Sequence, residues 1–261
     1  MLDKNRIKNS FSRQAASYEK SSFLQQGIAN QLALRISGQP QTILDIGCGT
    51  GYLTGLLLDK YPKAKISALD IAPGMIEIAK AKYPGVEFSV ADAEVLPYPD
   101  QSFDCVISST TYQWLPDLEK ALAEVQRVLL GDGNFVFSLF GGKTLYELRE
   151  VYNEAFQQLY PGKAVPLHPF ISMVELFKVL ESMQIITLKK EIITLTYFDI
   201  KSLLQQIKGW GAQNAHIEKI DGLGMRPLLA LTEKLYKQKH AVPAGIQVTW
   251  EVFYGKARKK Q

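Results

Sequence analysis

The chain has 261 residues, of which 46% are hydrophobic and 21% are charged. This composition is ordinary for a globular protein with one large domain, and it excludes a disordered chain. The two cysteines, Cys48 and Cys105, are too few for a disulfide scaffold or a four-thiolate zinc site. No apolar run approaches the ~20 residues of a membrane-spanning helix. Residues 1–20 lack the apolar region of a secretory signal, so we expect a cytoplasmic protein.

The net charge of +4 is unevenly distributed along the chain. Residues 201–261 contain eleven Lys or Arg against four Asp or Glu, an excess of +7, which leaves −3 for the first 200 residues. We expect residues 256–261 to be a frayed terminus. The rest of the excess indicates either an acidic partner or a solvated surface, and it is too modest for nucleic-acid binding. The candidate docking residues are Lys201, Lys208, Arg226, Lys234, Lys237 and Lys239.

Residues 3–36 repeat apolar side chains at helical spacing and are predicted to be helical, with Gly38 and Pro40 ending the segment. Short apolar runs then alternate with amphipathic segments. The predicted strands are 42–46, 65–69, 86–90, 102–108 and 134–140, the predicted helices are 53–59, 73–82 and 118–130, and a Gly-Asp-Gly turn is predicted at 131–133. This alternation is typical of βαβ units, which build a parallel sheet with helices on both faces.

The alternation stops after residue 140. Residues 143–158 and 173–182 are predicted helices, joined by a loop at 161–169 that contains Pro, Gly and His. Residues 185–197 and 246–254 alternate like strands, and the segment between them, 201–241, is predicted to be mostly helical.

A glycine-rich loop, Asp45-Ile-Gly-Cys-Gly-Thr-Gly51, connects the first predicted strand to its helix. Its glycines permit positive φ and let the backbone approach a ligand closely. The G-x-G-x-G spacing differs from the nicotinamide-cofactor and NTPase motifs, and the loop contains no Lys or Arg to hold a pyrophosphate. We therefore expect a nucleoside ligand without phosphate, with an amino-acid-like part near the backbone amides. A simple turn after a strand would also use glycines.

Carboxylates end the next two predicted strands. Asp70 lies 19 residues after Gly51, where a carboxylate can accept hydrogen bonds from both hydroxyls of a ribose. Asp92 can accept a hydrogen bond from an adenine amino group, and Ala93 beside it leaves room for the ring. Each Asp alone could instead cap a helix. The ordered set, at strand ends that meet at one edge of the sheet, predicts a nucleoside site.

Residues 42–140 resemble the class I S-adenosylmethionine-dependent methyltransferases. The matching stretches are ILDIGCGTG, ALDIAPGMIEIAK, VADAEVLPYPDQSFDCVISS and QWLPDLEKALAEVQRVLLGDGNFVFS. The resemblance implies a doubly wound, Rossmann-like α/β fold with seven mostly parallel strands, the last antiparallel, and S-adenosylmethionine (SAM) at the carboxyl edge. The chain then divides into an N-terminal helical cap at 1–40, a SAM-binding core at 41–140, a helical lid insertion at 141–184, and C-terminal strands and helices at 185–261 that complete the sheet.

The resemblance also implies contacts to each part of SAM. These contacts are Asp45, Gly47 and Gly49 at the methionine part, Asp70 at the ribose, Ile71, Met75, Asp92 and Ala93 at the adenine, and Ser109 and Gln113 near the sulfonium, with Gly51 as a further cofactor-binding residue of the loop.

The outer segments RIKNSFSRQAASYEKSSFLQQGIANQL, KGWGAQN and VTWEVFYGKA resemble the malonyl-acyl-carrier-protein O-methyltransferases of biotin synthesis. This likeness implies esterification of the free carboxylate of malonyl-acyl-carrier protein. Two alternatives remain at this point: a methyltransferase for a free dicarboxylic acid or quinone precursor, and a methyltransferase-like assembly or binding factor.

A carboxylate acceptor is already ionised at neutral pH, so no general base is predicted. The three histidines, His168, His216 and His240, lie in separate segments, which agrees with this expectation, and no metal site is visible. Cys48 is interpreted as a small loop residue and not a nucleophile, and Cys105 as core. The candidates for positioning the substrate are Tyr18, Gln113, Trp114, Lys143, Arg149 and His168.

Overall fold

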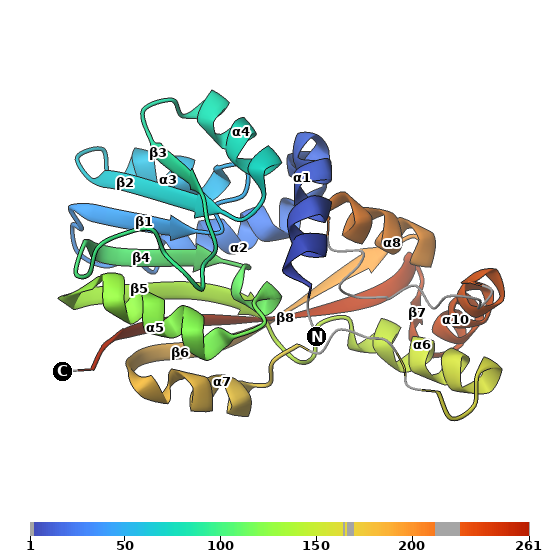
Figure 1. Ribbon diagram of the computed structural model, residues 1–261. Helices are drawn as coiled ribbons and strands as arrows, with labels where there is room; N and C mark the ends of the chain where they lie inside the picture. The colour runs from blue at the N-terminus through green and yellow to red at the C-terminus, as the bar shows by residue number, and fades with distance from the viewer. Residues whose placement is uncertain (1–2, 164, 166–169, 212–224, 261) are drawn as a thin grey trace.

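The computed structural model describes residues 3–163, 165, 170–211 and 225–260 (Figure 1). A twisted sheet with strand order β3-β2-β1-β4-β5-β8-β6 runs through the molecule. Its strands are β1 (Thr42–Ile46), β2 (Lys65–Asp70), β3 (Glu87–Val90), β4 (Phe103–Ser109), β5 (Leu129–Phe140), β6 (Met183–Tyr197), β7 (Ala241–Val242) and β8 (Gly245–Lys259). Strands β1 to β5 are mutually parallel, and β8 is antiparallel to both of its neighbours.

The expected doubly wound, mostly parallel sheet is confirmed. Within the part of the chain that the structure describes, it has eight strands and not the expected seven. The additional strand is β7, a two-residue arm that pairs only with the start of β8. The helices are α1 (Lys4–Ser21), α2 (Phe23–Ala33), α3 (Tyr52–Lys60), α4 (Pro73–Lys82), α5 (Leu118–Val128), α6 (Tyr146–Leu159), α7 (Met173–Val179), α8 (Ile200–Gly209) and α10 (Met225–His240), with short 3-10 turns η1 (Tyr112–Trp114) and η2 (Leu180–Ser182).

The strands are apolar because both faces of the sheet are covered. Neighbouring residues of β1 enter different cores: Ile43 packs with α2 and α3, and Leu44 packs with α5. Cys105 and Val106 of β4 divide in the same way. Helices on both faces are therefore needed to bury the sheet. The carboxyl ends of its strands are not covered by these helices and are available for a binding site.

The N-terminal segment is helical as predicted, and it consists of two helices, α1 and α2. Ser22 separates them with φ −95° and ψ 27°. The indole of Trp210 and the amide of Gln206 donate hydrogen bonds to the Ser21 carbonyl at 2.5 and 3.2 Å. This carbonyl is thus engaged by α8 and the residue after it, and α2 starts anew in a different direction.

Two predictions of irregular structure, a turn at 131–133 and a frayed terminus at 256–261, were wrong. The predicted turn at 131–133 lies inside β5, which starts at Leu129 and shifts register against β4 between Phe103 and Cys105. The predicted frayed terminus is ordered through Lys259, because β8 pairs along its whole length with β6. Arg258 also pairs with Asn134 of β5.

The outer half of β8 projects beyond the end of β5, as Figure 1 shows. There β8 pairs with β6 and, at its start, with β7. Helices α6 and α10 pack against β8 and each other, and α8 packs against β6. Helix α6 belongs to the predicted lid and α10 to the predicted C-terminal part, so these two parts pack as one unit. Among the described residues, no helix is long and apolar enough to cross a membrane.

Candidate functional site

A cavity of about 960 Å³, including its open mouth, lies at the carboxyl ends of the parallel strands beneath α1. Its volume is in the range of small-molecule and cofactor sites. Most of the residues predicted from the strand ends line it. The predicted cofactor contacts found there are Gly47, Gly49, Asp70, Ile71, Met75, Asp92, Ala93 and Ser109, and the predicted substrate contacts are Tyr18, Gln113 and Trp114.

The glycine loop is shaped by its neighbours as well as by its own flexibility. The N–H groups of residues 47 and 48 donate hydrogen bonds to the Leu69 carbonyl at 2.8 and 2.9 Å. Gly47 has φ +72°, and a Cβ there would lie 2.2 Å from Thr111 Oγ1. Gly49 has φ +56°, with no other atom within 4 Å of a Cβ built on it. The loop therefore leaves open space beside Gly49 and none beside Gly47.

Asp70 holds the loop and also faces the cavity. One carboxylate oxygen accepts a hydrogen bond from the Gly49 N–H at 3.0 Å, and the other accepts from the Ala72 N–H at 2.8 Å. Burial raises the pKa of Asp70 to about 6, although these backbone hydrogen bonds oppose the shift. A carboxylate has about four acceptor positions, more than these backbone N–H groups occupy, so the ionised side chain can still accept hydrogen bonds from a ligand.

Two buried acceptors lie in a smaller pocket of about 430 Å³ that shares Tyr18, Gly47 and Gly49 with the cavity. Asp45 Oδ2 accepts a hydrogen bond from Thr54 at 2.7 Å, but Asp45 Oδ1 has no partner among the described residues. Gln25 Oε1 also lacks one there. Unsatisfied buried acceptors are costly, and a ligand with hydrogen-bond donors or positive charge would satisfy them.

Helix α1 forms the roof of the cavity and is held at both ends. Near its start, Lys4 Nζ lies 2.6 Å from an Asp92 oxygen and 2.7 Å from a Glu94 oxygen. Near its end, Glu19 accepts a hydrogen bond from Thr50 at 2.6 Å and forms an ion pair with Lys82 of α4. The roof thus bridges the ends of β1 and β3, and its release would expose the cavity.

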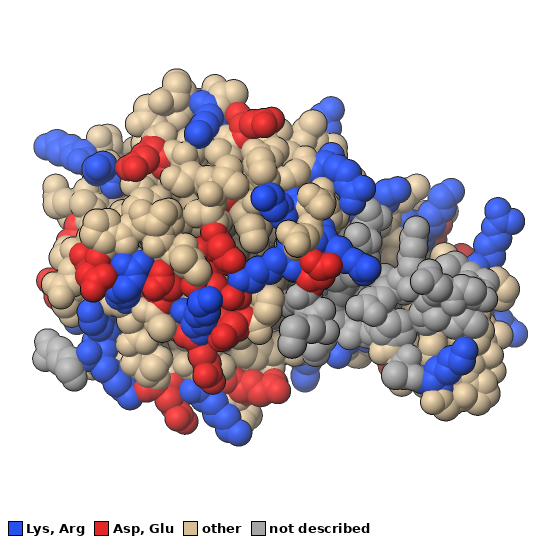
Figure 2. Space-filling view, viewed as in Figure 1, with Lys and Arg blue, Asp and Glu red and all other residues tan. Residues whose placement is uncertain are grey.

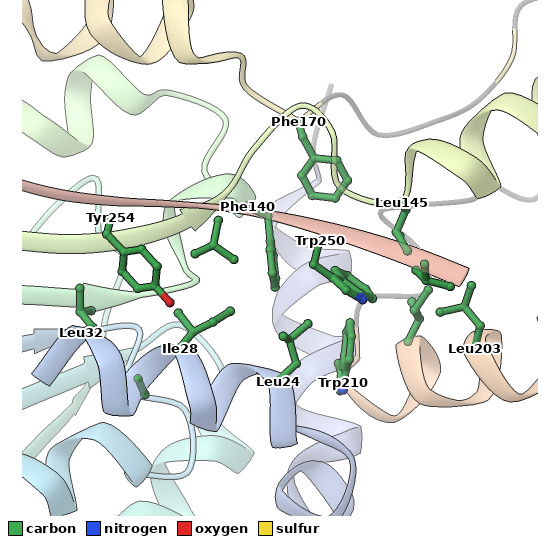
Figure 3. Close-up of a cluster of buried hydrophobic side chains, with 14 of the residues drawn as sticks. Leu24, Ile28, Leu32, Phe140, Leu145, Phe170, Leu203, Trp210, Trp250 and Tyr254 are labelled. Atoms are coloured by element: carbon green, nitrogen blue, oxygen red, sulfur yellow. The ribbon is translucent and has the colours of Figure 1, made fainter. Parts of the chain in front are cut away.

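The other end of the cavity is aromatic. Phe140, Trp210 and Trp250 line it, with Trp250 5.1 Å from Trp210 and 5.4 Å from Phe140 between ring centroids (Figure 3). Phe11 of α1 meets Trp114 edge-on at 5.9 Å. The cavity therefore has a polar end with the carboxylates of Asp70 and Asp92 and an apolar end built from distant parts of the chain.

Known proteins match both the core and the whole chain. Residues 44–137 match the methyltransferase-domain family. The malonyl-acyl-carrier-protein O-methyltransferase of Halorhodospira halophila is 34% identical over 265 residues, which cover 98% of this chain and 88% of the relative. The chain belongs to the malonyl-acyl-carrier-protein O-methyltransferase family. A bifunctional biotin-biosynthesis protein of Saccharophagus degradans is 35% identical over 97% of this chain and 46% of its own length.

Solved structures agree on the fold of this family member. The YcgJ protein of Bacillus subtilis superposes with a TM-score of 0.62 at 20% identity, covering 91% of this chain and 98% of that one. At this identity, the likeness supports the class I methyltransferase fold and no finer property.

Several residues that the sequence suggested do not line the main cavity of this methyltransferase. Gly51, at the start of α3, packs against the Tyr83 ring. Asp45 lies in the adjoining smaller pocket. Lys143 is exposed, and Arg149 is half-buried with its guanidinium donating to the Gly142 carbonyl at 2.8 Å. No described residue of 143–182 lines the cavity. His168 and His216 lie outside the described residues.

The reason for this difference is the path of the chain after β5. The N–H of Gly141 donates a hydrogen bond to the Glu251 carbonyl at 2.8 Å, and the N–H of Leu145 donates to the Thr249 carbonyl at 2.8 Å. These bonds direct α6 along β8, away from the roof. His240 lies on α10, 3.2 Å from a Glu150 oxygen, and it does not line the cavity.

Contributors that sequence patterns missed include Lys4, Ile7, Phe11, Gln25, Thr110, Thr111, Phe140, Trp210 and Trp250. The helical period of residues 3–36 could have placed Lys4, Ile7, Phe11 and Tyr18 on one face of a helix. Trp210 and Trp250 gave no comparable signal, because only the tertiary fold brings them together.

The folded protein should become more stable as the pH falls from about 8 to about 5.5, and Asp45→Asn should weaken this dependence. Burial raises the pKa of Asp45 to about 7, and the charge of Asp70 adds to the shift, while the Thr54 hydrogen bond opposes it. In the unfolded chain an Asp has a pKa of about 3.9. Between these values the folded state binds a proton that the unfolded state does not, so lower pH favours folding.

Urea unfolding of the ligand-free protein at several pH values measures this effect. Asp45→Asn should be more stable than the parent at pH 8, where the parent buries a charge, and less different from it at pH 5.5. Asp59→Asn, at an exposed position of α3, is the matched control and should follow the parent. An unchanged pH dependence in Asp45→Asn would show that Asp45 does not carry the buried proton.

Proposed function

We propose that this chain transfers the methyl group of SAM to the free carboxylate of malonyl-acyl-carrier protein, as a step of biotin synthesis. The observation that carries the proposal is the match along nearly the whole chain, which includes the segments that build the roof and the aromatic end. A match confined to residues 44–137 would support a methyltransferase of unspecified substrate.

The polar end of the cavity suits SAM in charge and size. Asp70 would accept hydrogen bonds from the ribose hydroxyls, and Ile71 and Met75 offer apolar surface to the adenine. The unpartnered oxygens of Asp45 and Gln25 would receive the ammonium group of the methionine part. When bound, SAM supplies a methyl group that is already activated by its sulfonium.

Asp92, which we assign to the adenine edge, also pairs with Lys4 of the roof. Its Oδ2 faces Lys4, and its Oδ1 accepts a hydrogen bond from the Glu94 N–H at 3.0 Å. Lys4 thereby connects the roof to the carboxylate that we assign to the adenine edge. The Lys4–Asp92 contact therefore both holds the roof in place and completes the adenine edge of the proposed donor site.

The residues of the chain have to align the acceptor and exclude water. Alignment alone can contribute several kcal/mol to catalysis, and a malonyl carboxylate needs no base because it is ionised at neutral pH. Burial, with the charge of Asp70, raises the pKa of the Tyr18 hydroxyl well above its usual range. Tyr18 therefore stays protonated and can donate a hydrogen bond in the cavity. Ser109 and Thr110 add polar groups between the two ends.

Methyl transfer to competing acceptors tests this proposal. The protein is incubated with SAM and, separately, with malonyl-carrier protein, malonyl-pantetheine, free malonate and longer free diacids, and the products are identified by mass spectrometry. We expect a methyl ester on both malonyl thioesters, with the carrier-bound substrate preferred. Methylation of free diacids alone would favour the small-molecule alternative, and SAM binding without transfer to any acceptor would favour a binding factor.

A further inference from the structure

We infer that the acidic carrier protein docks on the outer face of α1 together with the adjoining face of α8. The inference rests on the proposed function and specifies where its partner binds. It differs from the docking surface suggested by the sequence, most of which falls on α10. Below, the basic roof surface means Arg6, Arg13 and Lys20 of α1 with Lys201 and Lys208 of α8.

Helix α1 has two functional faces. Ile7, Phe11 and Tyr18 line the cavity from its inner face. Arg6, Arg13 and Lys20 follow one another at intervals of seven residues, so they share a face, and the helical period places that face opposite the lining residues. All three are exposed. The helix that closes the donor site thus presents a basic stripe to the solvent.

Helix α8 continues this surface. Lys201 and Lys208 are also seven residues apart and exposed. The two helices are joined where Ser10 Oγ donates a hydrogen bond to the Gly211 carbonyl at 2.6 Å and Trp210 donates to Ser21. Figure 2 shows Lys and Arg side chains gathered over α1 and along α8, whereas the region around α5 has mixed charges.

Most of these charges are available to a partner. Within the described part of the chain, no carboxylate lies within 4 Å of the charged groups of Arg13, Lys20, Lys201 or Lys208. Only Arg6 has an ion pair, with Asp3 at 3.4 Å and with both side chains exposed. Such an exposed pair is weak and can exchange for a pair with a partner.

Helix α10 differs in its position, and two of its lysines differ in their ion pairs. Lys237 pairs with Glu233 at 2.7 Å, and Lys239 pairs with Glu150 and Glu154 of α6 at 3.0 and 2.6 Å. No described residue of α10 lines the cavity. Figure 1 places α10 at the far end of the molecule from β1 to β3. A carrier bound there would meet two lysines that are already paired and would be remote from the proposed donor site.

The seam between α1 and α8 also leads to the correct end of the cavity. A Cβ on Gly211 would lie 3.1 Å from the Phe11 Cα, so the two segments are in contact. Phe11 and Trp210, one on each side of this seam, both line the cavity at its aromatic end. A carrier held on the basic roof surface would therefore place its acyl arm beside the apolar walls that receive an acceptor.

Charge reversal tests the docking site. The double variant Arg13→Glu/Lys20→Glu and the single variant Lys208→Glu are compared with the control Arg226→Glu/Lys234→Glu, which reverses two exposed charges on α10. For each, kcat/KM is measured for malonyl-carrier protein and for malonyl-pantetheine, which has no carrier, at low and high salt. Circular dichroism and SAM titration confirm that each variant is folded.

The roof variants should lose about tenfold or more in kcat/KM for the carrier substrate at low salt, mainly through KM, because steering by complementary charge acts on association. Added salt should reduce the difference from the parent. Malonyl-pantetheine kinetics and the α10 control should stay near the parent values.

Three results would overturn the docking site: equal losses on both substrates, a loss in the α10 control alone, or carrier kinetics unaffected by any reversal. The proposed function would survive all three, as long as the parent protein methylates malonyl-carrier protein. If the parent methylates neither malonyl thioester, the proposed function fails and the docking site fails with it.

Discussion

Gly47→Ala should abolish measurable SAM binding and destabilise the protein. An alanine Cβ at this position would lie 2.2 to 2.7 Å from three atoms of the Thr111 side chain. Thr111 is branched at Cβ and stiff, so relief requires movement of the backbone that begins η1. The φ of +72° adds a cost of about 1–2 kcal/mol for a residue with a Cβ. Movement of Thr111 would also displace Gln113 and Trp114 from the cavity wall.

Substitutions at two other glycines distinguish the effect of the Cβ clash from the effect of the positive φ. Gly49→Ala has the same unfavourable sign of φ but no atom within 4 Å of its Cβ, so it should destabilise less and act mainly on ligand binding. Gly85→Ala has neither feature and should match the parent. Calorimetric titration with SAM and thermal unfolding measure both effects. Normal binding in Gly47→Ala would mean that the loop does not border the donor site.

Asp70→Ala should weaken SAM binding by about 1.5–3 kcal/mol, the range for hydrogen bonds to a charged group, which corresponds to roughly 10- to 150-fold in Kd. Asp70 carries both the loop contacts and the acceptor positions that face the cavity. Because the pKa of Asp70 is raised to about 6, the parent should also bind SAM more tightly as the pH rises from about 5 to about 7. The variant should lose the part of this pH dependence that Asp70 contributes.

Asp104→Ala is a matched control for Asp70→Ala. The Asp104 carboxylate accepts hydrogen bonds from the N–H groups of Gln41 and Thr42 at 2.9 and 2.8 Å, so its removal also breaks two backbone contacts. It lies at the opposite ends of the strands, away from the cavity. Asp104→Ala should lower stability and leave SAM affinity unchanged. Equal affinity losses in both variants would assign the Asp70 effect to folding.

The polar end of the cavity, which we propose as the donor end, could be predicted from the sequence because its determinants are local. The loop after β1, Asp70 at the end of β2 and Asp92 after β3 follow strands whose apolar patterns are plain. Parallel pairing then brings those ends together without further information. The antiparallel direction of β8 was expected only from the resemblance to the class I methyltransferases, and the structure confirms it.

The roof and the apolar end of the cavity depend on contacts between distant residues. Lys4 and Asp92 are 88 positions apart, and the Trp210 indole meets the Ser21 carbonyl across 189 positions. No periodic pattern encodes such pairs. Lys143 and Arg149 were predicted to position the substrate because they follow β5, at the edge of the sheet where the site lies, but neither lines the cavity. The hydrogen bonds of Gly141 and Leu145 to β8 then turn the chain away from it.

A crystal structure of the chain with S-adenosylhomocysteine, the product of methyl transfer, is the most direct test of the cavity beneath α1. We expect the ribose hydroxyls within hydrogen-bond distance of the Asp70 carboxylate and the adenine against Ile71 and Met75. The ammonium group should approach Asp45 Oδ1, and α1 should stay in place over the ligand through Lys4 and Asp92. A ligand bound elsewhere, or one whose ribose avoids Asp70, would contradict the assignment of the donor site.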